Sequence, residues 1–204
     1  VVDDSTGSEK GSVAQTATIK ITGANDGPTA SAAIAPGPVT EDASSFTQSL
    51  LANASDAEQA TDTLTVANVT YTLKDGTGGG ASDVPFTNTT PPGVSLSGTD
   101  LTINPTAYNE LAVGETRVIE ASYDVVDDKG ATFAQTATFT ITGANDGPIV
   151  SDAITKTVLE NATPDLVVDL LENASDVDDL SSALAVENIT YTVGGDSTDS
   201  GGTV

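Results

Sequence analysis

Two segments of this 204-residue chain each occur twice, and both recurrences have the same spacing. Residues 14–28 read AQTATIKITGANDGP and residues 134–148 read AQTATFTITGANDGP, an offset of 134 − 14 = 120 residues. Residues 50–56 (LLANASD) return as residues 170–176 (LLENASD), again with an offset of 170 − 50 = 120. Two separate segments with one offset indicate a tandem array, so one repeated unit accounts for most of the chain.

The repeat predicts where the units begin and end. Because Pro28 and Pro148 occupy equivalent places, one complete unit is expected at residues 28–147. Residues 1–27 then correspond to the C-terminal end of a preceding unit, and residues 148–204 to the N-terminal part of a following unit. We therefore expect a window from a longer array, a design that favours length, spacing or multivalency over chemistry.

Apolar and polar residues alternate in the expected strands. In residues 136–142, Thr alternates with Ala137, Phe139 and Ile141, which is the period of a strand with one buried face. Residues 97–100 fit a hairpin turn, and only residues 104–113 favour a short helical turn. The pattern predicts an all-β, immunoglobulin-like β-sandwich unit of about 120 residues. Further inward rows are expected at Ile119, Ala121, Tyr123 and Val125, at Val69, Tyr71 and Leu73, and at Ile189, Tyr191 and Val193.

The charge and composition oppose several functions. The chain has 30 acidic and 6 basic residues, a net charge of −24. This excess opposes binding to nucleic acid or to an anionic membrane, because both require clustered Lys and Arg. The chain has neither His nor Cys, so it lacks the commonest catalytic base, thiol nucleophiles, disulfides and thiolate metal sites. No apolar run approaches the roughly 20 residues that span a bilayer. We expect neither an enzyme nor a membrane-inserted protein.

The acidic residues recur at matching positions of successive units. Asn-Asp precedes Gly-Pro at each expected junction, a Glu lies early in each unit, and an acid-x-acid pair follows the repeated Leu-Leu segment. An Asp-Asp pair precedes the last strand, at Asp3 and Asp4 as well as in the complete unit. Ca²⁺ binds about six to eight oxygen atoms of carboxylates, carbonyls and amides, and this set supplies such ligands. Alternatively, these residues only cap turns and strands. The candidate calcium ligands are Asn25, Asp26, Glu41, Asp56, Glu58, Asp127, Asp128, Asn145, Asp146, Glu160, Asp176 and Asp178.

Three segments, in order, resemble a known family. Residues 108–115 read YNELAVGE, residues 123–128 read YDVVDD, and residues 141–148 read ITGANDGP. The chain resembles the VCBS and bacterial cadherin-like repeats of very large surface adhesins and RTX-type exoproteins. The resemblance implies tandem cadherin-like β-sandwiches with calcium bound between consecutive domains by the candidate ligands. Asp127 and Asp128 also fit the end of a strand, and Glu58 stands where the next unit has Asp178.

The resemblance implies a calcium-rigidified extender, or stalk, of a large secreted or cell-surface bacterial adhesin, as found in biofilms. Its partners would be neighbouring repeats of the same chain, joined through calcium, while any surface ligand would bind to other domains. Two other functions stay open. A calcium-dependent module for carbohydrate or another surface would use an exposed aromatic side chain, for which Tyr108 is the best candidate. A subunit of an extracellular fibre would associate with copies of itself.

Overall fold

The chain is built of strands. The structure is a computed structural model that describes residues 1–2, 6, 12–58, 62–77, 84–86, 89–161, 163–179, 183–190 and 192. The 3-10 turn η1 (Pro105–Tyr108) lies inside the segment predicted to hold a helical turn. No helix among the described residues has the length and hydropathy needed to cross a membrane. The predicted all-β class is confirmed, whereas Asp3, Asp4, Tyr191 and Val193 lie outside the described residues.

Two sheets form the body of the protein, and we call them the sheet pair. The larger sheet contains, in spatial order, β2 (Val39–Thr40), β10 (Thr132–Thr142), β9 (Thr116–Val126), β5 (Thr65–Thr77) and β6 (Val84–Phe86). The smaller sheet contains β3 (Phe46–Ser49), β8 (Asp100–Ile103) and β7 (Val94–Ser97). Neighbouring strands are antiparallel except β10 and β2, which run parallel. The turn between β7 and β8 pairs Ser97 with Asp100, as predicted.

The inward rows of both sheets pack into one core. On β9 and β10, Tyr123, Phe139 and the apolar residues that alternate with polar ones are at most 3% exposed. They meet Leu101 and Ile103 of β8 in the same buried cluster. The rings of Phe46 on β3 and Phe139 on β10 lie 6.1 Å apart, which joins the two sheets directly. The alternation in sequence therefore identified the core face of the larger sheet. Ile189, in contrast, is 49% exposed.

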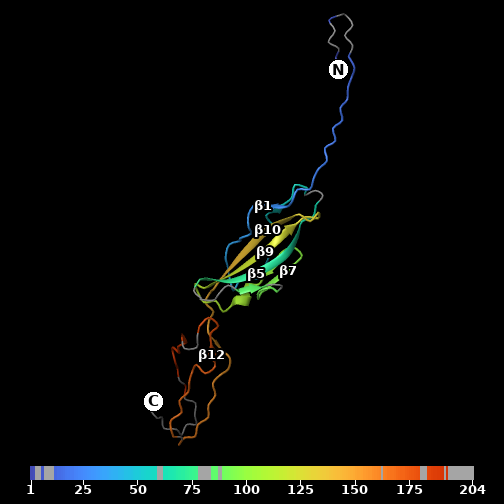
Figure 1. The fold of residues 1–204 in the computed structure, drawn as a ribbon. Helices are drawn as coiled ribbons and strands as arrows, with labels where there is room; N and C mark the ends of the chain where they lie inside the picture. Colours follow the sequence, from blue (N-terminus) through green and yellow to red (C-terminus); the bar gives the residue numbers. More distant parts are fainter. Residues whose placement is uncertain are drawn as a thin grey trace.

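Local structure recurs 120 residues apart at opposite ends of the sheet pair. Strand β1 (Thr29–Ala30) pairs with β4 (Ala54–Ser55), and β11 (Ile149–Val150) pairs with β12 (Ala174–Ser175) in the equivalent register. Asn53 donates a side-chain hydrogen bond to the carbonyl of Ala32, as Asn173 does to that of Asp152. In Figure 1, β1 and the blue segment before it lie at one end of the sheet pair, and β12 lies beyond the other. The chain therefore has two places where flanking segments meet the sheet pair.

Two buried tyrosines offer a matched test of the core. The Tyr123 hydroxyl donates a buried hydrogen bond of 2.8 Å to the Leu50 carbonyl, and burial raises the pKa of Tyr123 to about 12. The Tyr71 hydroxyl is equally buried but has no hydrogen-bond partner among the described residues. We expect Tyr123→Phe to lower the free energy of unfolding by about 1 kcal/mol, since it leaves a buried carbonyl unpaired. Tyr71→Phe should leave stability unchanged or raise it. Urea unfolding of both variants checks this, and an equal loss in both would contradict it.

Candidate metal centres at the two ends of the sheet pair

Three carboxylates meet at the C-terminal end of the sheet pair. Glu41, Asp146 and Asp178 each place a carboxylate oxygen within 4.8 Å of the other two, and we call them the C-terminal cluster. Strand β2 runs parallel to β10, and the Glu41 amide continues this ladder by donating to the Thr142 carbonyl at 3.0 Å. The pairing sets Glu41 beside the Ala-Asn-Asp segment that follows β10. Asp178 comes from the segment after β12, so the cluster joins this segment to the sheet pair.

Glu41 is fully buried and is held by backbone groups. Its Oε1 accepts a hydrogen bond of 2.7 Å from the Ala144 amide, and its Oε2 accepts one of 3.2 Å from the Leu111 amide. Burial nevertheless raises the pKa of Glu41, and the nearby charges of Asp178 and Asp146 add to this rise. The two amides fix the carboxylate in place without neutralising it, so the negative charges of the cluster oppose one another.

Asp146 forms hydrogen bonds with the side chains of Asp178 and Asn109. Its amide donates a hydrogen bond of 2.6 Å to Oδ2 of Asp178, and its carboxylate accepts one from the Asn109 side chain. Burial, with the charges of Asp178 and Asp42, raises the pKa of Asp146. The other oxygen of Asp178, Oδ1, is buried and has no hydrogen-bond partner among the described residues. One oxygen of the cluster thus lacks a hydrogen-bond donor in the part of the chain that the structure describes.

A second group of carboxylates lies at the N-terminal end. Asp56, Glu58 and Asp62 place carboxylate oxygens within 4.8 Å of one another, and we call them the N-terminal cluster. Asp56 follows β4, whose pairing with β1 brings it next to the Asn-Asp-Gly-Pro segment before β1. Asp56 is 8% exposed, and its buried Oδ2 has no hydrogen-bond partner within the described part of the chain. This end also presents an unsatisfied carboxylate oxygen.

The two clusters are built by the same pair of hydrogen bonds. At the N-terminal end, the Asp26 amide donates to Oε2 of Glu58 at 3.2 Å, and the Glu58 amide donates to Oδ1 of Asp56 at 2.9 Å. At the C-terminal end, 120 residues later, the Asp146 amide donates to Asp178 and the Asp178 amide donates to Oδ1 of Asp176. The repeated sequence therefore gives a repeated local geometry, in which the second acid of the acid-x-acid pair accepts a hydrogen bond from the Asp amide of the Asn-Asp segment.

Asp127 belongs to the N-terminal end but has a different role. One of its oxygens accepts hydrogen bonds from the Lys129 and Ala131 amides at 2.9 and 2.8 Å, which closes the turn between β9 and β10. The other accepts a hydrogen bond of 2.8 Å from the side chain of Asn25. The bond from Asn25 is the main reason why the pKa of Asp127 is lowered. Asp127 therefore fastens the preceding segment to the sheet pair and ends a strand, the alternative that the sequence left open.

This environment predicts a stability change in acid. The pKa of Asp127 is below its ordinary value of 3.8 in the folded chain, so its stabilising contribution is present above that pH. The contribution is lost as the pH falls through the folded pKa. We expect the melting temperature of the native chain to fall more steeply than that of Asp127→Asn between about pH 5 and pH 2. Asp100→Asn, in the exposed β7–β8 turn, is the control, and parallel curves for native and Asp127→Asn chains would contradict the assignment.

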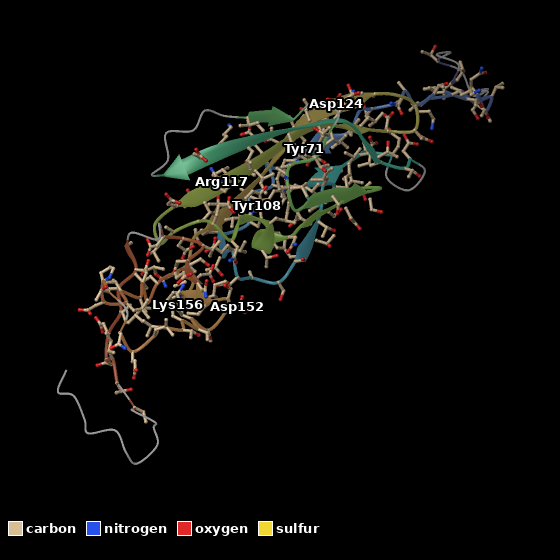
Figure 2. The ribbon with its side chains drawn as sticks, turned by 90° about the horizontal axis from the view of Figure 1, so that it is seen from below. Tyr71, Tyr108, Arg117, Asp124, Asp152 and Lys156 are labelled. Atoms are coloured by element: carbon tan, nitrogen blue, oxygen red, sulfur yellow. The ribbon has the colours of Figure 1, made fainter. Side chains whose placement is uncertain are left out.

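The remaining candidates are placed as follows. Asp128 is exposed and pairs with the Lys129 ammonium at 2.7 Å, and the exposed Asn145 bonds to the next carbonyl. Glu160 is exposed and belongs to neither cluster. The expectation that Tyr108 is an exposed aromatic is wrong: Tyr108 is 2% exposed, lies inside the body in Figure 2, and donates to the Pro92 carbonyl at 2.7 Å. A ring that is buried to this degree is not available to stack on a sugar.

Sequence reasoning missed two residues of these sites. Asp62 has no acidic counterpart, since Ser182 stands at 62 + 120 = 182, so recurrence gave no signal for it. Asn109 lies in a segment that occurs once in the chain, so recurrence could not identify it either. Its place in the resemblance segment 108–115 was the one available signal.

The donor sets fit a hard divalent cation. Each cluster offers carboxylate oxygens, and the chain has no sulfur or imidazole ligand. Ca²⁺ prefers such all-oxygen sites and tolerates irregular geometry. The buried oxygens of Asp56 and Asp178 that lack hydrogen-bond partners are where a cation would compensate the cost of burial. The sequence of the chain matches no protein-family model and no curated protein.

Proposed function

We propose that this chain is a calcium-rigidified extender of a large secreted or cell-surface bacterial adhesin. In this proposal, residues 28–147 are one complete cadherin-like β-sandwich of a tandem array, flanked by parts of its neighbours, as in the VCBS repeats that the sequence resembles. The two clusters are calcium sites at successive junctions, and neighbouring repeats are the partners that they join. The array projects a distal binding module away from the cell.

The observation that carries the proposal is the recurrence of one junction geometry at an offset of 120 residues. In both places an acid-x-acid pair accepts a hydrogen bond from the amide of the Asn-Asp segment, and three carboxylates converge. A single acidic cluster is common on protein surfaces. Two clusters with the same hydrogen bonds, at opposite ends of the sheet pair, are what a periodic array of linked units requires.

The C-terminal cluster indicates how a cation would act. Glu41 belongs to the sheet pair, Asp146 to the connecting segment and Asp178 to the segment beyond β12. Without a cation, the three negative charges repel one another. This repulsion favours motion of the segment beyond β12 relative to the sheet pair. A bound Ca²⁺ supplies the opposite charge shared by all three. The carboxylates would then be held together, and the free energy of binding would stabilise the joined arrangement through linkage.

A scattering experiment tests this function. We expect the 204-residue chain to show a longer and better defined maximum dimension by small-angle X-ray scattering in Ca²⁺ than in chelator. Asp178→Asn removes a carboxylate of the junction and should make the two profiles more alike. Asp100→Asn changes the same group on an exposed turn and should keep the native difference. Identical native profiles with and without Ca²⁺ would exclude a calcium-stiffened stalk. A rise in molecular mass with Ca²⁺ would instead favour a self-associating fibre subunit.

A further inference from the structure

Lys129 places an ammonium group against the N-terminal cluster. Its Nζ lies 3.3 Å from Oδ1 of Asp62 and 2.7 Å from Oδ1 of Asp128. Its backbone is held in the β9–β10 turn, where its amide donates to Asp127 and the next residue, Gly130, has a left-handed φ of 92°. The turn fixes the root of the side chain, so the ammonium is confined to the neighbourhood of these carboxylates. Both contacts raise the pKa of Lys129, with Asp128 as the larger cause.

The ammonium and the cluster share one cavity. A cavity of about 420 Å³ is lined by Gly23, Ala24, Asn25, Glu58, Asp62 and Lys129. Asp62 connects the ammonium to the cluster, because its carboxylate is part of the cluster and also forms the ion pair with Lys129. The cluster contains the buried Asp56 oxygen that lacks a hydrogen-bond partner among the described residues. A cation entering here would therefore meet a positive charge that already uses one of its ligand groups.

The C-terminal end differs at the position that Lys129 contacts in the N-terminal cluster. The position equivalent to Asp62 is Ser182 in the following segment, which offers no carboxylate. The carboxylate of Asp62, with which Lys129 pairs, thus has no counterpart in the following segment.

We propose that Lys129 is a tethered counter-ion of the N-terminal cluster, which competes with divalent cations for Asp62 and lowers their affinity at this end. This inference rests on the calcium role proposed above. In the absence of a divalent cation, Lys129 neutralises part of the cluster and stabilises it. When Ca²⁺ binds, the ammonium has to withdraw from Asp62, and Asp128 is the carboxylate that retains it.

Calorimetric titration of the 204-residue chain with Ca²⁺ tests the competition. Lys129→Gln removes the charge, and we expect it to tighten Ca²⁺ binding at the N-terminal cluster by about five- to tenfold, the effect of one unit charge close to a partly exposed site. Lys129→Arg keeps the charge and should bind as the native chain does. Lys74→Gln is the matched control, because Lys74 pairs with Glu120 on the larger sheet, at 3.1 Å and outside both clusters. Asp56→Asn should abolish the phase that Lys129→Gln tightens.

A second readout is the melting temperature. In chelator, Lys129→Gln should melt below the native chain, because the cluster loses its counter-ion, whereas in saturating Ca²⁺ this deficit should shrink or reverse. Unchanged or weaker binding by Lys129→Gln, with binding by the native chain intact, would overturn this inference and leave the proposed function standing. No binding of Ca²⁺ by the native chain or by any variant would overturn the proposed function and this inference together.

Discussion

Saturating Ca²⁺ is expected to raise the melting temperature of the chain by roughly 10 °C or more over its value in chelator. At a thousandfold excess over the dissociation constant, a cation bound only to the folded state adds about 4 kcal/mol of stability per site. For a cooperative unit of this size, each kcal/mol shifts the melting temperature by about 2–4 °C. Removing the repulsion among Glu41, Asp146 and Asp178 is the physical source of the gain.

Differential scanning calorimetry in Ca²⁺, in Mg²⁺ and in chelator measures this effect. Mg²⁺ is the specificity control, because it demands near-octahedral geometry and keeps much of its water, so irregular carboxylate clusters bind it weakly. Equal shifts with both cations would indicate general screening of a chain with a net charge of −24. Equal melting temperatures in Ca²⁺ and in chelator would leave an acidic all-β protein without cation junctions.

Glu41→Gln is expected to remove about half of the stabilisation by Ca²⁺, since it disables one of the two clusters. In chelator, the same substitution should have a small effect, because two contributions oppose each other. Gln still accepts from one of the amides of Ala144 and Leu111 but offers a donor to the other. Against this, it removes a buried charge that Asp146 and Asp178 repel. A fully buried glutamate would thus be needed chiefly when the cation is present.

Glu115→Gln is the matched control for this prediction. Glu115 accepts a hydrogen bond of 3.3 Å from the Ala112 amide in the loop that also contacts Glu41, but it is not part of either cluster. We expect it to keep the native difference between Ca²⁺ and chelator. If Glu41→Gln kept the full calcium effect while it lost stability in chelator, Glu41 would be a structural acceptor for two amides and no part of a cation site.

Patterns within one strand predicted burial correctly, whereas contacts between distant segments left no such pattern in the sequence. Alternation placed Phe139 and Ile141 in the core, because the side chains of a strand point to opposite faces in turn and one face of the larger sheet is buried. The same logic gave no information about Tyr108, which is the last residue of the 3-10 turn η1. Tyr108 is buried and donates a hydrogen bond to the carbonyl of Pro92, 16 residues earlier, so its environment comes from a segment outside any strand pattern. An aromatic residue outside a strand pattern therefore looked exposed when it was not.

The candidate site shows the same division. Recurrence selected Asp56, Glu58, Asp146 and Asp178, and the structure brings each of them into a carboxylate cluster. It also selected Glu160, which joins neither cluster. It passed over Asp62, because the repeats differ at that position. Recurrence finds what successive units share, so it cannot find a ligand or a counter-ion that one unit has by itself.

By itself, the sequence determined the 120-residue offset, the all-β class and the acidic residues of the recurring segments, because these depend on local alternation and on the identity of short segments. The tertiary structure decided which carboxylates meet. Glu41 lies far from Asp146 in sequence, and the parallel pairing of β2 with the end of β10 sets them side by side. Glu41 is therefore part of the C-terminal cluster. Asp56, in contrast, is part of the N-terminal cluster, where the pairing of β4 with β1 places it. The direction and register of the strands determine which carboxylates come together, and neither can be predicted from the spacing of acidic residues.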